Sequence, residues 1–149
     1  MRIKEIILDV IPDEILTKNQ QSSNGYRIWS ATKSAARLEG KQIVADELKR
    51  LNYKAEYYDC PNLHKGKNIC KDRHLMKQAT VHITQYHHKK AKDWDGLAVS
   101  VSAFIDGAIE EESLLHSDSP TYITEYTLET IKVQSKEEVH TTVLFTAVP

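Results

Sequence analysis

Two aspartates one residue apart, Asp93 and Asp95, are the side chains in this sequence best suited to chemistry. They precede a segment with helical periodicity, and both can turn toward one cation. Their oxygens suit Mg²⁺, which takes one or two carboxylates and leaves its other positions to water and phosphate oxygens. Such a site calls for a third acid, and Asp118, just past the helix, is the candidate. Acids before a helix are also common N-caps, so spacing alone leaves both interpretations open.

A basic run lies directly before these acids and consists of His88, Lys89, Lys90 and Lys92. Clustered cations of this kind bind DNA chiefly through phosphates, which makes binding sensitive to salt. The formal net charge of the whole chain is only −1, whereas nucleic-acid-binding domains are often strongly basic. The run therefore indicates a local DNA-binding footprint or an ordinary solvated surface.

A helix and a strand are expected to position these residues. Leu97, Val101, Phe104 and Ala108 recur at helical spacing and predict a half-buried helix that continues to Glu112. The alternating, β-branched segment 79–86 predicts a strand that leads into the basic run. A strand that delivers carboxylates to a helix start is the rigid placement that a metal site requires.

The other elements predict an α+β fold, in which a mixed sheet carries two main helices. The 149 residues suit a single domain, 1–149. In chain order we expect a strand at 2–10, a loop at 17–30, a helix at 31–52, and strands at 54–59, 121–133 and 139–147. The apolar face of the first helix is expected to comprise Leu38, Val44, Leu48 and Leu51.

Three segments of the chain together resemble the RusA family of Holliday-junction resolvases, especially its phage and prophage branch. They are Asp93-Trp94-Asp95-Gly96-Leu97, Phe104-Ile105-Asp106-Gly107 and Ser117-Asp118-Ser119-Pro120. The resemblance implies an endodeoxyribonuclease that hydrolyses phosphodiester bonds in four-way junctions, with Mg²⁺ or Mn²⁺, in DNA recombination and repair. It also implies branched DNA as partner and a homodimer, because a two-fold symmetric junction needs two active sites.

The resemblance assigns roles to individual acids. Asp93, Asp95 and Asp118 match the three positions that bind the metal and are required for cleavage, and Asp106 matches a further acid of structural role. Because the chain is expected to reverse at 114–119 and return as a strand beside the one that ends at Tyr86, we expect the three carboxylates to converge on one cleft.

Three positions depart from the family pattern. Gly96 stands where the family has Asn, Ser102 where it has Lys, and Ser117 where it has the first Asp of a pair. These departures favour an alternative: a RusA-like DNA-binding protein whose catalysis is weakened or lost.

Two lesser alternatives involve histidines. His82 and His140 each begin a His-x-Thr motif on a predicted strand, a pattern typical of 2H phosphoesterases, in which paired histidines act as general base and acid. Separately, Cys60, His64, Cys70 and His74 form two Cys-x3-His pairs. Four such ligands suit structural zinc, although the spacing differs from the usual zinc fingers.

Two features that the sequence lacks bear on the cellular location of the protein. No run is long and apolar enough to span a membrane, and the N-terminus carries charges where a signal peptide would be apolar. The two cysteines provide no disulfide framework. We therefore expect a cytoplasmic protein without a membrane partner.

Overall fold

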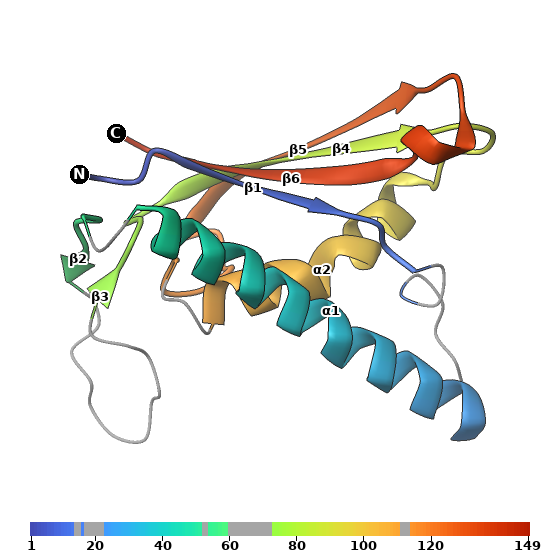
Figure 1. Cartoon of the computed structure of the whole chain (residues 1–149), viewed down its shortest axis with the longest axis horizontal. Helices are drawn as coiled ribbons and strands as arrows, with labels where there is room; N and C mark the ends of the chain where they lie inside the picture. The colour runs from blue at the N-terminus through green and yellow to red at the C-terminus, as the bar shows by residue number, and fades with distance from the viewer. Residues whose placement is uncertain (14–15, 17–22, 52–53, 60–72, 111–113) are drawn as a thin grey trace.

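The computed structural model describes residues 1–13, 16, 23–51, 54–59, 73–110 and 114–149, and these residues form an α+β fold, as predicted. A four-stranded mixed sheet carries two helices (Figure 1). The elements in chain order are β1 (Glu5–Val10), α1 (Ser23–Arg50), β2 (Tyr58–Asp59), β3 (Arg73–His74), β4 (Ala79–His87), α2 (Trp94–Glu110), β5 (Ile123–Lys132), the 3₁₀ helix η2 (Lys136–Glu138) and β6 (His140–Ala147).

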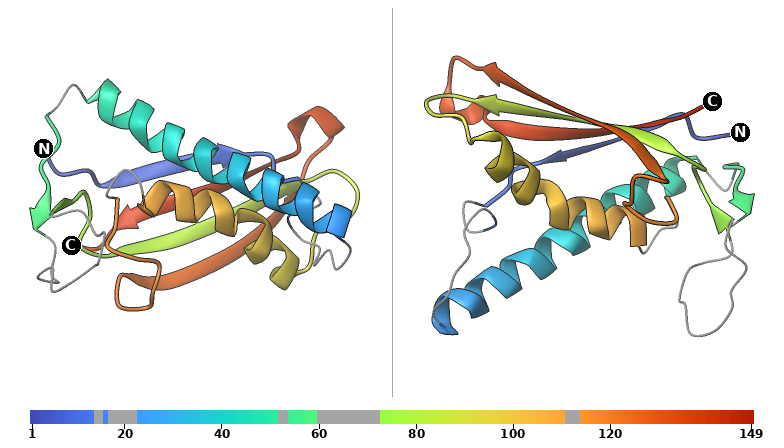
Figure 2. Two further views of the ribbon diagram at one scale, coloured as in Figure 1. Left: turned by 90° about the horizontal axis from the view of Figure 1, so that it is seen from below. Right: turned by 180° about the vertical axis from the view of Figure 1, so that it is seen from behind.

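The main sheet has the strand order β1-β6-β4-β5. β1 and β4 both pair with β6 antiparallel, whereas β4 and β5 are parallel and joined by α2. Figure 2 shows both helices on the same side of the sheet. A parallel pair needs such a crossover, because the chain must return to the starting end before the next strand begins.

The core lies between the helices and one face of the sheet. The expected apolar stripe of α2 is buried, with Leu97 and Val101 fully covered. Alternate residues of the central strands meet it, among them Ile83 of β4 and Val143 of β6, which are paired across the ladder. This alternation is the period-two pattern of strands with one buried face, so the periodicity of the sequence predicted the core correctly here.

The two helices approach so closely that each needs a glycine at the crossing. A Cβ on Gly40 of α1 would overlap the carbonyl oxygen of Phe104, and one on Gly107 of α2 would overlap that of Arg37. The expected apolar face of α1 is partly wrong, because Leu38 is 63% exposed. Ala36 and Gly40, both small and buried, lie on the packed side instead.

Other boundaries also differ from expectation. Helix α1 begins at Ser23, so residues 23–30 of the expected loop are helical, and residues 17–22 lie outside the described part. Ser and Asn are found both in loops and at helix starts, so their presence did not distinguish the two. The expected strand 54–59 shrinks to β2, which pairs antiparallel with the unexpected β3.

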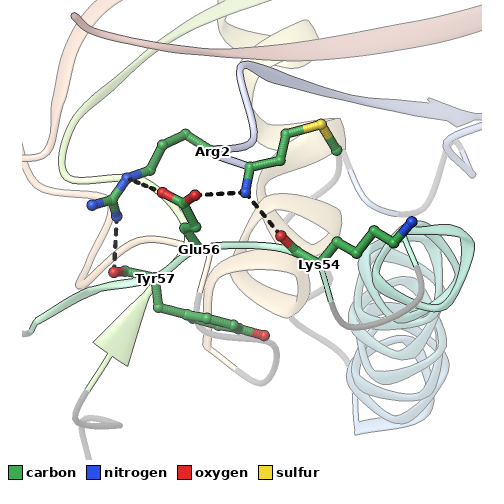
Figure 3. Close-up of polar contacts among 5 residues, drawn as sticks. Arg2, Lys54, Glu56 and Tyr57 are labelled. Carbon is green, nitrogen blue, oxygen red and sulfur yellow. Dashed lines mark hydrogen bonds and ion pairs between the residues drawn. The ribbon is translucent and has the colours of Figure 1, made fainter.

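The N-terminus is tied to the segment that follows α1. The ammonium group of Met1 donates to Lys54 O at 2.9 Å and to Glu56 Oε1 at 2.8 Å. Arg2 Nη1 donates to Tyr57 O at 2.8 Å, and Arg2 Nε lies 3.3 Å from Glu56 Oε2 (Figure 3). These groups are exposed, so each ion pair adds little stability. Together they hold the start of β1 at the end of the sheet remote from the basic run.

Candidate nucleic-acid interface

Asp93 and Asp95 lie where the sequence predicted, at the start of α2. Asp93 is the N-cap: its Oδ1 accepts a hydrogen bond from the Gly96 N–H at 2.6 Å, and its backbone oxygen accepts from the Leu97 N–H at 2.9 Å. A Cβ on Gly96 would lie 2.8 Å from Asp93 Oδ1. Glycine here therefore lets the cap close tightly. Asp95 is exposed in the first turn, where the helix dipole favours an anion.

Asp118 lies at the opposite end of the sheet from these two acids. It is exposed in the turn before β5, and that strand starts beside Ala79, the first residue of β4. Asp93 and Asp95 lie beyond the other end of β4, in the stretch from its last residue, His87, to the first turn of α2. The nine residues of β4 span about 30 Å, and the 17 residues of α2 span about 25 Å back.

The expected convergence of Asp93, Asp95 and Asp118 is therefore wrong. The chain does reverse after α2, but it reverses only after the helix has carried it to the starting end of β4 (Figure 1). Across the described ranges, no three His, Cys, Asp or Glu side chains are grouped so that they could hold a metal ion. The three-carboxylate site does not fit this fold.

Asp118 instead lies near Asp106 and Tyr126. Burial, followed by the negative charges of Asp118 and Asp106, raises the pKa of Tyr126 to about 12. Asp106 lies in the second half of α2, whereas Asp93 and Asp95 lie at its start.

A basic pocket forms where β4 ends and α2 is about to begin. The two termini lie at the other end of the sheet (Figure 1). Its volume is about 720 Å³. All four residues predicted to bind DNA line it, and Lys136 of η2 joins them from a distant part of the chain. Among the residues that the structure describes, the lining consists of Ile11, Pro12, Gln85, His87, His88, Lys89, Lys90, Lys92, Lys136, Glu137 and Val139.

The pocket contains buried polar atoms without partners. Gln85 is only 8% exposed, and neither its Oε1 nor the Nδ1 of His87 has a hydrogen-bond partner among the described residues. Both residues precede the basic run on β4, on the strand face turned toward the helices. Buried polar atoms normally find a partner in the protein or in water, so these two unpaired atoms mark a place where a ligand group or a water is expected.

The pocket wall is held in place by the strand ends. The Val133 N–H donates to His87 O at 2.8 Å, which extends the β4–β5 pairing by one step. The rings of Tyr86 and His140 stack, with centroids 4.3 Å apart. The lysines are thus attached to a fixed sheet end, although the side chains of Lys89, Lys90 and Lys136 reach solvent.

A neighbouring cavity of about 530 Å³ has the opposite character. It is lined by three acids, Asp9, Glu39 and Glu137, together with His140 and apolar residues. Glu137 borders both cavities. An anionic ligand is repelled by this cavity and attracted by the basic pocket, so the charges of this end of the molecule direct a phosphate to one side.

His82 and His140 share the uncovered face of the sheet but do not form a pair. Their motifs lie on antiparallel neighbours, with Thr84 opposite Thr142. His82 Nε2 lies 2.8 Å from Glu129 Oε2 on β5, on the side away from β6. His140 stacks on Tyr86 and contacts Glu138 O through Nδ1 at 2.7 Å. The rings therefore make separate local contacts.

The zinc hypothesis falls mostly on residues outside the described part, namely Cys60, His64 and Cys70. His74, the fourth candidate ligand, is buried, and its ring meets that of His116 edge-on at 5.7 Å.

Sequence reasoning did not single out Gln85 or Lys136, nor the lining residues Ile11, Pro12, Glu137 and Val139, whereas His87 adjoins the predicted basic run. Gln85 stands on the predicted strand 79–86, just before the basic run, and the alternation of β4 places it on the same face as Ile83, turned toward the helices. The alternation along the strand could therefore have identified Gln85 from the sequence. No sequence pattern identifies Lys136, because only the pairing of β6 with β4 brings η2 to this end of the sheet.

Comparison of the chain with protein-family models, curated proteins and solved structures finds no match. Of the helices within the described ranges, none has the length and apolar character needed to cross a membrane.

Proposed function

We propose that this protein binds branched DNA through the basic pocket, as a RusA-like DNA-binding protein. The observation that carries the proposal is the pocket itself: four lysines and two histidines gathered around buried, unpartnered polar atoms. Lysines of this kind neutralise phosphates and release counterions, which supplies affinity independent of sequence. In a homodimer, two such pockets would hold two arms of a junction.

Cleavage of DNA depends on other residues than binding of DNA does. Asp93 and Asp95 lie next to the pocket in sequence, but Asp118 lies at the opposite end of the sheet, too far away to share a metal ion with them. The substitutions at Gly96, Ser102 and Ser117 point the same way. Binding without efficient cleavage is therefore the function that this geometry supports best.

The test uses fluorescence anisotropy with a labelled four-way junction and a linear duplex of the same length, in EDTA. We expect the junction to bind with a Kd well below the range of about 10⁻⁴–10⁻⁶ M that is typical of non-specific binding, and more tightly than the duplex. Junction affinity no better than that of the duplex would contradict the proposal of branched DNA.

The same junction is then incubated with Mg²⁺ and analysed for nicks. We expect little or no cleavage. Efficient nicking that requires Mg²⁺ and is abolished by Asp95→Asn, with junction binding retained, would instead support the endonuclease interpretation and show that the metal site is completed in another way.

A further inference from the structure

The floor of the basic pocket is built differently from its rim. The rim lysines Lys89, Lys90 and Lys136 are exposed. The floor contains Gln85, which is 8% exposed, and the buried Nδ1 of His87. A group that satisfies the floor atoms must enter the pocket, whereas a group that contacts only the rim need not.

The backbone of DNA can satisfy the rim lysines but not every atom of the floor. Its phosphodiesters offer oxygen acceptors and no donors, so they cannot pair with the amide oxygen of Gln85, which is itself an acceptor. A nucleobase N–H or a sugar hydroxyl does offer a donor. The ligand that matches the whole pocket therefore brings a base or sugar to Gln85 and a phosphate to the lysines.

We propose that the basic pocket receives one whole nucleotide that carries a terminal phosphomonoester. The volume of about 720 Å³ falls within the range of roughly 300–1,000 Å³ that is usual for small-molecule sites. A strand end at a nick or flap and a free nucleoside monophosphate share this chemistry. The inference rests on the proposed DNA-binding function and makes it more specific, since it predicts preference for branched DNA that contains a phosphorylated end.

The charge of the lining matches a monoester better than a diester. Among the described lining residues, four lysines face a single carboxylate, that of Glu137; the lysines are Lys89, Lys90, Lys92 and Lys136. A phosphomonoester carries a charge of about −1.5 to −2 near neutral pH, against −1 for a diester. Both interact favourably with the lysines, and the monoester gains more.

The test compares labelled single strands with a 5′-phosphate, a 3′-phosphate or no terminal phosphate, alongside an intact junction with blocked ends. We expect one phosphorylated end to bind at least about tenfold more tightly than the unphosphorylated strand, the effect of one good charge-assisted contact set. Gln85→Leu, which keeps the volume and removes the amide, should weaken binding of the phosphorylated strand, because the nucleotide loses its partner on the pocket floor. Gln134→Leu, an exposed position outside the lining, is the matched control.

Circular dichroism checks that Gln85→Leu folds, and Lys136→Ala is a surface variant that tests the same pocket if it does not. Equal binding of phosphorylated and unphosphorylated ends overturns the inference while junction binding keeps the proposed function. Failure of every DNA to bind overturns both.

Competition distinguishes the two sources of the ligand. A nucleoside monophosphate that displaces the phosphorylated strand at similar concentration indicates a free nucleotide, and one that is more than about tenfold weaker indicates a strand end. Inorganic phosphate that competes as well as the nucleotide would overturn the role assigned to Gln85.

Discussion

At the residue scale, Asp93 caps a helix, a role that the sequence alone could not distinguish from metal binding. Its carboxylate caps α2 by accepting the Gly96 N–H, which is the common role of an acid before a helix. The position at a helix start was predictable, because the apolar period of α2 fixes where the helix can begin. Whether the side chain faces a cation or its own backbone was not, because both uses favour the same residue type.

Substitution of Asp93 separates capping from charge. Asn caps a helix about as well as Asp, so Asp93→Asn should leave the free energy of unfolding nearly unchanged, whereas Asp93→Ala should lower it by about 1 kcal/mol. Denaturation by urea measures both. Equal losses for the two variants would show that the negative charge, and not the hydrogen bond, is what matters at this position.

Tyr126 tests the location of Asp118. Because the folded chain holds the Tyr126 pKa at about 12, above the usual value of about 10, its neutral form contributes stability that is complete below pH 10. That contribution is lost as pH rises through the folded pKa. Tyrosinate absorbance, assigned with Tyr126→Phe, follows this titration.

Asp118→Asn should lower the Tyr126 pKa toward its usual value, since a negative charge is removed nearby. Asp93→Asn should leave it unchanged, because Asp93 lies at the other end of the sheet. If Asp93→Asn lowered the Tyr126 pKa and Asp118→Asn did not, Asp118 would not lie beside Tyr126, and the topology described above would be contradicted.

At the scale of elements, the crossing of α1 and α2 depends on backbone contact. Gly40 looks in the sequence like a weak point of a helix, because glycine costs about 1 kcal/mol relative to alanine there. In the fold it lies against Phe104 O, and Gly107 lies against Arg37 O. Such a reason is not visible from one helix alone, since the partner segment is more than sixty residues away.

Alanine at either crossing glycine should destabilise the protein. Gly40→Ala and Gly107→Ala each place a Cβ against a backbone carbonyl that cannot rotate away, so the helices must separate, and we expect a loss of roughly 3 kcal/mol in the free energy of unfolding. Ser34→Ala, at an exposed position of α1, is the control and should change it by only a few tenths of a kcal/mol. A gain of about 1 kcal/mol for either glycine variant, as at an open helix site, would refute the close crossing.

At the scale of the whole molecule, the parallel pairing of β4 and β5 decides which residues can meet. Local periodicity predicted most of the strands, α2 and the fold class, because each depends on neighbouring residues. It could not predict that β5 starts beside the start of β4. Asp118 therefore lies at the end of the sheet opposite Asp93 and Asp95. The same long-range pairing brings Lys136 to the predicted basic run.

The salt dependence of junction binding tests the central claim most directly, namely that the basic pocket holds DNA phosphates. The variant carries Lys89→Ala, Lys90→Ala and Lys136→Ala. The control removes three exposed lysines at the opposite end of the sheet, Lys4, Lys54 and Lys77.

We predict that the pocket variant binds all DNA sequences more weakly and that its plot of log K against log salt concentration loses about one unit of slope for each phosphate contact removed, roughly three in all. The control should keep the slope of the unaltered protein. An unchanged slope in the pocket variant, or an equal loss in both, would contradict the assignment of this pocket as the DNA-binding site.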